Sequence, residues 1–270
     1  MSIPKKSLGQ HWLTDDRTLS TIVQTAGVQK SDTVLEIGPG QGSLTSKLTA
    51  KAGQVIAIEL DESLAASLPK TLNAGNLEVI QGDVLKFDLS TLPRHYKVVA
   101  NIPYYLTSNL LRILAESANP PAFMVLLVQK EVAERLCAVP GQMSILAVSV
   151  QLYYECRLGQ LIPAELFTPP PKVDSQVVIL NQRPKPLFEN LDSKLFFRLV
   201  KAGFSEKRKK LRSSLAGGLG ISRQEVDGLL KKAAINGDRR AQELSLREWH
   251  RLLRSYQKMT VVSAPYPTNT

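Results

Sequence analysis

The chain has 270 residues, of which 43% are hydrophobic and 21% charged, an ordinary balance for a globular protein. This length suffices for one full hydrophobic core and a smaller second one. No apolar run approaches the length of a membrane span, and the polar N-terminus lacks the apolar segment of a signal peptide. Cys137 and Cys156 are isolated and have no metal-ligand spacing, so we expect structural thiols, a cytoplasmic protein and no metal site.

The net charge of +10 is unevenly distributed along the chain. Residues 1–183 contain 16 Lys and Arg against 16 Asp and Glu, whereas residues 184–270 contain 18 against 8. The proline-rich segment Arg183-Pro-Lys-Pro186 marks the change. This asymmetry predicts a neutral catalytic domain over 1–183 and a basic domain over 184–270 that binds a polyanion. Nucleic acid is the favoured polyanion, and an anionic membrane surface is the alternative.

Helical and strand patterns alternate through the first domain. A helix is predicted from Asp15 to Ala26, a strand over 33–37, and a helix from the following glycines to about Lys51. Later strands are predicted at 54–58, 77–80, 96–100, 122–128, 158–162 and 175–180, and later helices at 64–72, 130–138 and 142–153. This order indicates an α/β fold with a doubly wound parallel sheet. Helices at about 192–204, 207–216, 222–234 and 245–257 predict a smaller, all-helical C-terminal domain.

The first strand ends in a glycine loop, Gly38-Pro-Gly-Gln-Gly42. Its spacing differs from that of dinucleotide-binding loops, and it lacks the Gly-Lys-Ser/Thr that binds phosphates, which disfavours an NAD-dependent oxidoreductase. With Glu36 before it and no basic residue in it, the loop suits a nucleoside without phosphate. S-adenosylmethionine is the candidate ligand, and a plain tight turn is the alternative.

Acidic side chains follow the next two strands. Glu59 is placed to accept hydrogen bonds from ribose hydroxyls, and Asp83 from an adenine amino group. The alternatives are a helix N-terminal acid for Glu59 and a turn residue for Asp83. Because Gly38, Glu59, Asp83 and Asn101 all fall at the carboxyl ends of predicted parallel strands, we favour the ligand-binding interpretation.

The sequence Asn101-Ile-Pro-Tyr104 at a strand end suits methylation of an amino nitrogen whose lone pair is delocalised into a ring. The Asn101 side-chain oxygen and a backbone carbonyl, for which we choose Ile102, can hold the two hydrogens and aim the lone pair at a methyl donor. Tyr104 offers an aromatic face for a flipped-out base. A simple turn is the alternative for this motif.

Five motifs together resemble the rRNA adenine N6-dimethyltransferase family, in its branch that acts on small-subunit RNA. They are Lys6-Ser-Leu-Gly-Gln-His-Trp-Leu13, Glu36-Ile-Gly-Pro-Gly-Gln-Gly42, Asn101-Ile-Pro-Tyr104, Phe167-Thr-Pro-Pro-Pro-Lys-Val-Asp-Ser175 and Phe204-Ser-Glu-Lys-Arg-Lys-Lys-Leu-Arg-Ser-Ser-Leu215. The resemblance implies a Rossmann-like S-adenosylmethionine-dependent methyltransferase fold. The positions that it implies for the cofactor are His11, Leu13, Gly38, Gly40, Glu59, Asp83 and Asn101. It further implies that Tyr104 and Phe167 sandwich the target adenine.

The resemblance also implies the reaction, in which each of two adjacent adenosines near the 3′ end of small-subunit (16S) rRNA receives two methyl groups on N6. The expected partners are this rRNA and the immature small ribosomal subunit, bound by a monomer without a membrane. A non-catalytic rRNA-binding assembly factor that keeps the fold is the alternative function.

Some residues keep a second interpretation. His11 stands where many relatives carry Asn, and a structural role competes with a cofactor role. Trp12 stands where Phe is usual, and Phe167 could simply belong to the core. The cations expected to bind RNA phosphates, which could instead form a solvated helix face, are Lys207, Arg208, Lys209, Lys210 and Arg212.

The last predicted helix is amphipathic. Its apolar face is expected to pack against the C-terminal core and comprises Leu246, Trp249, Leu252, Leu253 and Tyr256. The opposite face carries Arg247, Arg251, Arg254 and Lys258. Membrane binding is the alternative use of such a helix.

Overall fold

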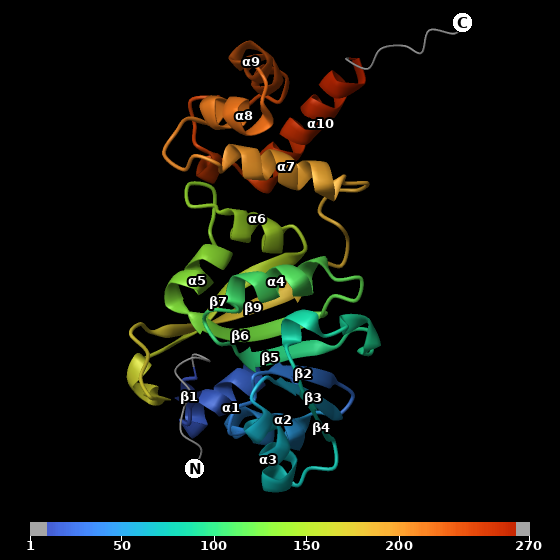
Figure 1. The fold of residues 1–270 in the computed structure, drawn as a ribbon, viewed down its shortest axis with the longest axis vertical. Helices are drawn as coiled ribbons and strands as arrows, with labels where there is room; N and C mark the ends of the chain where they lie inside the picture. The colour runs from blue at the N-terminus through green and yellow to red at the C-terminus, as the bar shows by residue number, and fades with distance from the viewer. Residues whose placement is uncertain (1–9, 263–270) are drawn as a thin grey trace, which may run out of the picture. The chain divides into compact units, whose positions relative to one another are not determined.

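The structure, a computed structural model, describes residues 10–262 and divides into two compact units. The first unit comprises the chain up to Cys137 together with Tyr153–Pro184 (Figure 1). The second comprises Ala138–Leu152 and the chain from Lys185 onward, so it includes a segment that the sequence prediction assigned to the first domain. Among residues 10–262, no helix combines the length and apolarity needed to cross a bilayer.

A seven-stranded sheet forms the centre of the first unit, with strand order β4-β3-β2-β5-β6-β9-β7. Its strands are β2 (Thr33–Ile37), β3 (Gln54–Glu59), β4 (Leu77–Gln81), β5 (Lys97–Asn101), β6 (Phe123–Gln129), β7 (Tyr154–Ile162) and β9 (Ser175–Gln182). The strands from β4 to β6 are parallel, whereas β9 pairs antiparallel with both β6 and β7. The strand order reverses between β2 and β5, and open α/β sheets bind ligands outside the carboxyl ends of the strands at such a point.

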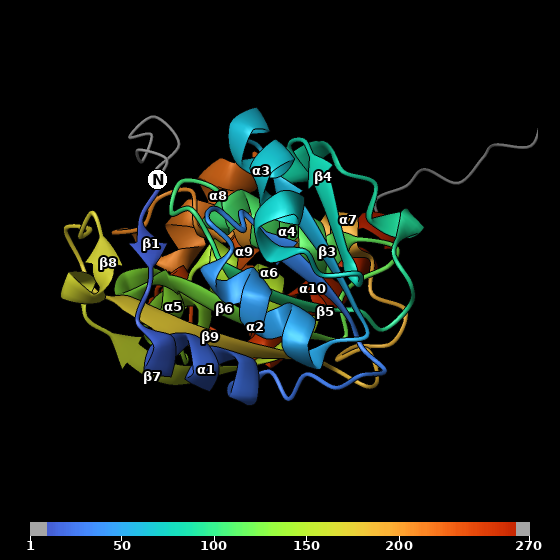
Figure 2. The same cartoon turned by 90° about the horizontal axis from the view of Figure 1, so that it is seen from below.

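The described part of the first unit has five α-helices, of which two have a side-chain cap at the N-terminus. These helices are α1 (Asp16–Thr25), α2 (Ser43–Lys51), α3 (Glu62–Leu72), α4 (Thr107–Glu116) and α5 (Lys130–Leu136). Asp15 accepts from the Thr18 N–H at the start of α1, and Asp61 does the same for Ser63 at the start of α3. Helices α1 and α2 lie side by side (Figure 2), and their leucines pack on β2 and β3 in one core cluster. Each such buried leucine stabilises the fold by roughly 1.5–3 kcal/mol.

A separate two-stranded ribbon joins distant parts of the first unit. Strand β1 (Trp12–Leu13) pairs antiparallel with β8 (Phe167–Thr168), which follows the short 3-10 turn Ala164–Leu166. The first residues of the motif that begins at Lys6 lie outside the described part of the chain.

The second unit is helical in its described part, as the sequence predicts for the C-terminal domain. It contains α6 (Ile145–Gln151), α7 (Ser193–Gly203), α8 (Leu211–Leu219), α9 (Arg223–Lys232), a 3-10 turn (Ala241–Glu243) and α10 (Leu246–Val262). The amphipathic prediction for α10 is confirmed, because Trp249, Leu252, Leu253 and Tyr256 are buried. The four cations of its opposite face are exposed.

Helix α8 departs from the prediction at both ends. Residues 207–210 form turns instead of the predicted first helical turn, and the helix begins only at Leu211, whose N–H donates to the Arg239 carbonyl. At the other end, Gly217 and Gly218 are helical, and the left-handed cap is Gly220. Helix α8 continues through these glycines because it crosses α7 closely, and a Cβ at position 218 would lie 2.6 Å from the Ala202 Cα atom.

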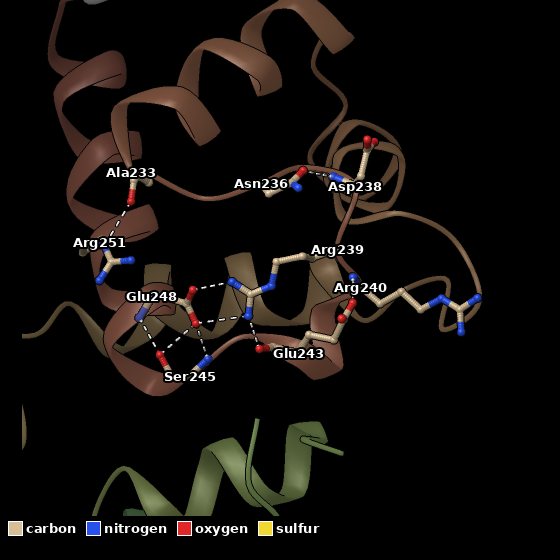
Figure 3. Close-up of polar contacts among 9 residues, drawn as sticks. All are labelled: Ala233, Asn236, Asp238, Arg239, Arg240, Glu243, Ser245, Glu248 and Arg251. Carbon is tan, nitrogen blue, oxygen red and sulfur yellow. Dashed lines mark hydrogen bonds and ion pairs between the residues drawn. The ribbon is translucent and has the colours of Figure 1, made fainter. Parts of the chain in front are cut away.

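An ion pair fixes the start of α10 within the second unit (Figure 3). Glu248 accepts hydrogen bonds from Arg239 and from the backbone N–H and hydroxyl of Ser245, and Arg239 also donates to the Glu243 carbonyl. Burial alone would raise the pKa of Glu248, but the bonds from Arg239 and Ser245 outweigh it and lower that pKa to about 2. The network therefore stabilises the folded unit above the ordinary pKa of 4.5, and the contribution is lost as the pH falls toward 2.

The two adjacent glycines of α8 provide a matched test of this helix crossing. Gly218→Ala is expected to destabilise the protein by roughly 1–3 kcal/mol, because the methyl group meets the backbone of α7. A Cβ at position 217 would have no neighbouring atom within 4 Å, so Gly217→Ala should be neutral or stabilise by up to about 1 kcal/mol. Urea unfolding of both variants measures the difference, and equal effects would contradict the close crossing.

Candidate functional site

A cavity of about 220 Å³ lies at the carboxyl ends of the parallel strands in the first unit. Its walls come from the ends of β2, β3 and β5, from the residues after β4, and from the segment around β1. Of the residues that the sequence predicts for catalysis and cofactor binding, the cavity is lined by His11, Leu13, Gly38, Gly40, Glu59, Asp83, Asn101 and Tyr104. The parallel topology thus brings together side chains that are far apart in the sequence.

The loop after β2 can form only with glycine at its key positions. Gly38, Gly40 and Gly42 have φ angles of 65°, 58° and 86°, in the left-handed region that disfavours other residues. A Cβ on Gly42 would also lie 2.5 Å from a methyl carbon of Leu68, and one on Gly40 would lie 3.2 Å from the indole nitrogen of Trp12. The loop is therefore closely packed against α3 at Gly42 and against Trp12 at Gly40.

Glu59 holds this loop through its carboxylate, which is 5% exposed at the end of β3. One oxygen accepts from the Gly40 N–H at 3.0 Å, and the other accepts from the Asp61 N–H at 2.9 Å. Each carboxylate oxygen can accept a second hydrogen bond. Glu59 can consequently brace the loop and bind a hydroxyl group of a ligand at the same time.

Glu36 is a second carboxyl group in the cavity wall, and it is 1% exposed. Burial raises its pKa to about 8, with a further increase from the charge of Glu59 and a partial offset by Thr45. Its Oε2 atom has no hydrogen-bond partner among the described residues. Glu36 is therefore mostly neutral at pH 7, and Glu59 supplies the negative charge beside the loop.

Asn101 and His11 are tied to one another at the end of β5. The Asn101 side-chain amide donates to the His11 carbonyl at 3.2 Å, which identifies Oδ1 as the acceptor left for a ligand. The His11 ring nitrogen Nδ1 lies 2.7 Å from the Pro169 carbonyl. Because a carbonyl only accepts, Nδ1 carries the proton of this bond.

Tyr104 is held along one ring face and at its hydroxyl. Its ring stacks on that of His11 with a centroid distance of 5.8 Å and an interplanar angle of 22°. Its hydroxyl lies 2.7 Å from the hydroxyl of Ser175, the first residue of β9. Burial raises the pKa of Tyr104, so the phenol stays neutral.

Phe167, which the sequence resemblance places against the target adenine, lies outside the cavity lining. Its side chain is 2% exposed and packs in the core cluster with Leu13, Leu19 and Ile162, and it does not line the cavity. The pairing of β8 with β1 explains the difference, because it turns Phe167 inward next to Leu13. Phe167 is thus packed as a core residue in this structure, and its contact with the target adenine stays a prediction.

Sequence reasoning missed the contacts that orient these side chains. The Pro169 carbonyl and the Ser175 hydroxyl hold His11 and Tyr104, and no local pattern reveals bonds across such sequence separations. At the cavity wall, Leu60 and Tyr105 are 44% and 57% exposed. Their positions directly after Glu59 and Tyr104 are the only sequence signal that could have identified them.

The predicted phosphate-binding cations lie in the second unit and differ in their partners. Lys209 pairs with Glu206, Lys210 with Asp238, and Arg212 with both Asp227 and Asp238. Lys207 and Arg208 are exposed and form no ion pair within residues 10–262. The segment 207–210 is thus not part of a helix face. Its cations also differ in how available they are to an anion.

The comparisons with known proteins agree with one another. The model of the family "Ribosomal RNA adenine dimethylase" matches residues 1–258. The chain belongs to this family.

Relatives match over nearly the whole chain. A protein of Dehalococcoides mccartyi named "Ribosomal RNA small subunit methyltransferase A" is 41% identical over 93% of this chain and 88% of its own. The protein of the same name from Pelotomaculum thermopropionicum is 42% identical over 94% of this chain and 91% of its own.

Among solved structures, a dimethyladenosine transferase from Plasmodium falciparum is 28% identical, with a TM-score of 0.80 over 93% of this chain and 98% of its own. The 23S rRNA methyltransferase ErmE is 29% identical, with a TM-score of 0.74 over 91% of this chain and 99% of its own. The predicted methyltransferase fold with a helical C-terminal part is confirmed.

As a member of the rRNA adenine dimethylase family, the protein is a methyltransferase whose methyl donor is S-adenosylmethionine. S-adenosylmethionine carries no phosphate, and the glycine loop of the cavity has no basic side chain that would bind one. The cavity therefore fits this molecule. Acceptors suited to hydroxyl and amino groups stand at Glu59 and Asp83. One Asp83 oxygen accepts from the Leu85 N–H, and the other can accept from a ligand.

The two hydrogen bonds of Glu59 lead to a prediction for cofactor binding. An amide has one acceptor oxygen, so Glu59→Gln must set its NH₂ group against either the Gly40 or the Asp61 N–H. We expect Glu59→Gln to weaken S-adenosylmethionine binding by about 1–3 kcal/mol, as much as Glu59→Ala. Isothermal titration calorimetry measures the affinity of each variant for S-adenosylmethionine. Glu62→Gln, an exposed change on α3, is the control, and wild-type affinity in Glu59→Gln would remove Glu59 from the site.

Proposed function

We propose that the protein transfers two methyl groups from S-adenosylmethionine to N6 of each of two adjacent adenosines near the 3′ end of small-subunit (16S) rRNA. The family and the names of its relatives support rRNA adenine dimethylation. The observation that carries the proposal is the geometry of Asn101, whose amide nitrogen is bound to the His11 carbonyl while Oδ1 remains an acceptor at the cavity.

Asn101 suits the difficulty of this reaction. The N6 lone pair of adenine is delocalised into the ring, so the nitrogen is a poor nucleophile in the planar state. Oδ1 of Asn101 and the Ile102 carbonyl would accept the two N6 hydrogens and favour the pyramidal nitrogen. The cofactor supplies an electrophilic methyl group on a sulfonium. The methylated ammonium loses its proton readily to water, so no general base is required.

The other side chains of the cavity would divide the two ligands between them. Glu59 would accept from the ribose hydroxyls of the cofactor and Asp83 from its adenine amino group, while Gly38 and Gly40 allow its close approach to the backbone. Tyr104 would stack on the target adenine with the ring face that His11 does not cover. His11 and Leu13 would form the cavity wall between the two ligands.

Substitution of Asn101 tests the catalytic role. We expect Asn101→Ala to lower the rate of dimethyladenosine formation by about 10²–10³, the usual cost of losing one polar group that stabilises a transition state. The assay offers each protein small-subunit rRNA from a strain that lacks the gene, at saturating cofactor. Mass spectrometry then measures the dimethyladenosine formed. Asn109→Ala on the exposed face of α4 is the matched control.

The same assay separates the alternative function. A wild-type protein that binds the rRNA but forms no dimethyladenosine would be a non-catalytic assembly factor. An Asn101→Ala variant as active as the wild type would refute the catalytic assignment alone.

The second unit would bind rRNA phosphates. Lys207 and Arg208 carry this role because their charges have no carboxylate partner in the described part of the unit. Lys209, Lys210 and Arg212 are already neutralised by neighbouring acids, so a phosphate must compete with Glu206, Asp227 or Asp238. Binding as a monomer to the immature subunit in the cytoplasm belongs to the same proposal.

A salt titration distinguishes the two kinds of cation. Each phosphate contact releases condensed counterions and contributes roughly 0.7–0.9 to the slope of log K against log salt. Lys207→Ala combined with Arg208→Ala should weaken rRNA binding and reduce that slope by about 1.4–1.8. Lys209→Ala combined with Lys210→Ala is the matched control. It should change the affinity for rRNA and the slope less than the first pair does. If the plot of log K against log salt is the same for the Lys207 and Arg208 double variant and the wild type, these two cations form only a solvated surface.

A further inference from the structure

Ser175 is a buried hydroxyl residue that the reaction described above does not use. It is 0% exposed and does not line the cavity. Its hydroxyl lies 2.7 Å from that of Tyr104, a residue 71 positions earlier in the chain. This distance is that of a good hydrogen bond between two hydroxyl groups, either of which can donate.

The backbone around Ser175 is firmly fixed. Ser175 pairs with Gln129 of β6 on one side and with Ile162 of β7 on the other. The preceding residue, Asp174, accepts from the Lys130 N–H through its carbonyl and from the Ala164 N–H through its side chain. The Ser175 hydroxyl is therefore a rigid point at the end of a paired strand.

Tyr104, in contrast, lies in the connection between β5 and α4. The hydrogen bond from the Thr107 N–H to its carbonyl is long, at 3.5 Å, so Tyr104 is not held in a regular strand or helix. The side chain is held by two contacts: the His11 ring along one face and the Ser175 hydroxyl at the tip. Of these two contacts, the bond to Ser175 is the one that ties the ring to the central sheet.

We infer that Ser175 is a positioning residue for methyl transfer: its hydrogen bond to Tyr104 fixes the tip of the ring, and with it the tilt of the face on which the target adenine stacks. The inference rests on the proposed function. A stacked base follows the plane of the ring beneath it, so a tilted Tyr104 ring moves N6 away from Asn101 Oδ1. Small displacements of reacting groups cost large factors in rate. Because burial keeps the phenol neutral, its hydroxyl serves as a hydrogen-bonding group and not as a base.

A double-mutant cycle between Ser175→Ala and Tyr104→Phe tests this role. We expect Ser175→Ala to lower kcat about tenfold, with the affinity for S-adenosylmethionine unchanged. In the Tyr104→Phe background, Ser175→Ala should have no further effect, because the bond is already absent. Ser149→Ala, which removes another buried serine hydroxyl in α6, is the control and should leave kcat unchanged.

A second readout does not depend on catalysis. An RNA hairpin with 2-aminopurine at the target position reports stacking through quenching of its fluorescence, and we expect less quenching with Ser175→Ala than with the wild type. Equal losses of kcat from Ser175→Ala in both backgrounds, or unchanged quenching, would overturn the positioning role. A wild-type protein that quenches the probe but does not methylate adenosine in the unlabelled RNA would instead overturn the proposed function.

Discussion

The buried carboxylate of Glu59 is the constraint on which the site depends. It joins three elements, because it ends β3, binds the Gly40 N–H of the loop after β2, and binds the Asp61 N–H at the start of α3. Hydrogen bonds to an ionised group contribute more than neutral ones, and a buried carboxylate without them would be costly. The left-handed glycines can adopt the loop, but Glu59 selects the one conformation in which their backbone faces the cavity.

A second group of contacts brings the catalytic face together from both ends of the first unit. The pairing of β1 with β8 places His11 beside the Pro169 carbonyl, and His11 in turn supports Asn101 through its own carbonyl and Tyr104 through its ring. His11 thus has a structural role toward Asn101 and Tyr104 as well as a place in the cavity wall. These contacts support the structural interpretation of His11, and its contact with the cofactor stays a prediction.

The sequence predicted those parts of the site that depend on local pattern and topology. Glycine spacing, strand ends and the parallel order were enough to place Gly38, Glu59, Asp83 and Asn101 at one edge of the sheet. The sequence could not predict features that a long-range contact decides. Phe167 is buried because β8 pairs with β1, and the helix at Gly217 and Gly218 persists because α7 lies against it. Ion-pair partners such as Asp238 cannot be assigned from spacing, since the loop that carries them is placed by tertiary structure.

The distribution of charge explains how one chain handles a cationic cofactor and a polyanionic substrate. Two carboxyl groups of the cavity wall stand next to the glycine loop, and burial raises the pKa of Glu36 to about 8, which lowers the negative charge at this wall. A further ionised carboxylate would favour the sulfonium cation but would also repel RNA phosphates near the target base. The cations that we propose to bind RNA lie in the other unit, where acids such as Asp238 pair with several of them. Cations paired in this way contribute less to affinity than free ones, because phosphate must displace a carboxylate. In the proposed complex, affinity for RNA would therefore come mainly from Lys207 and Arg208, which have no carboxylate partner in the described part of the unit.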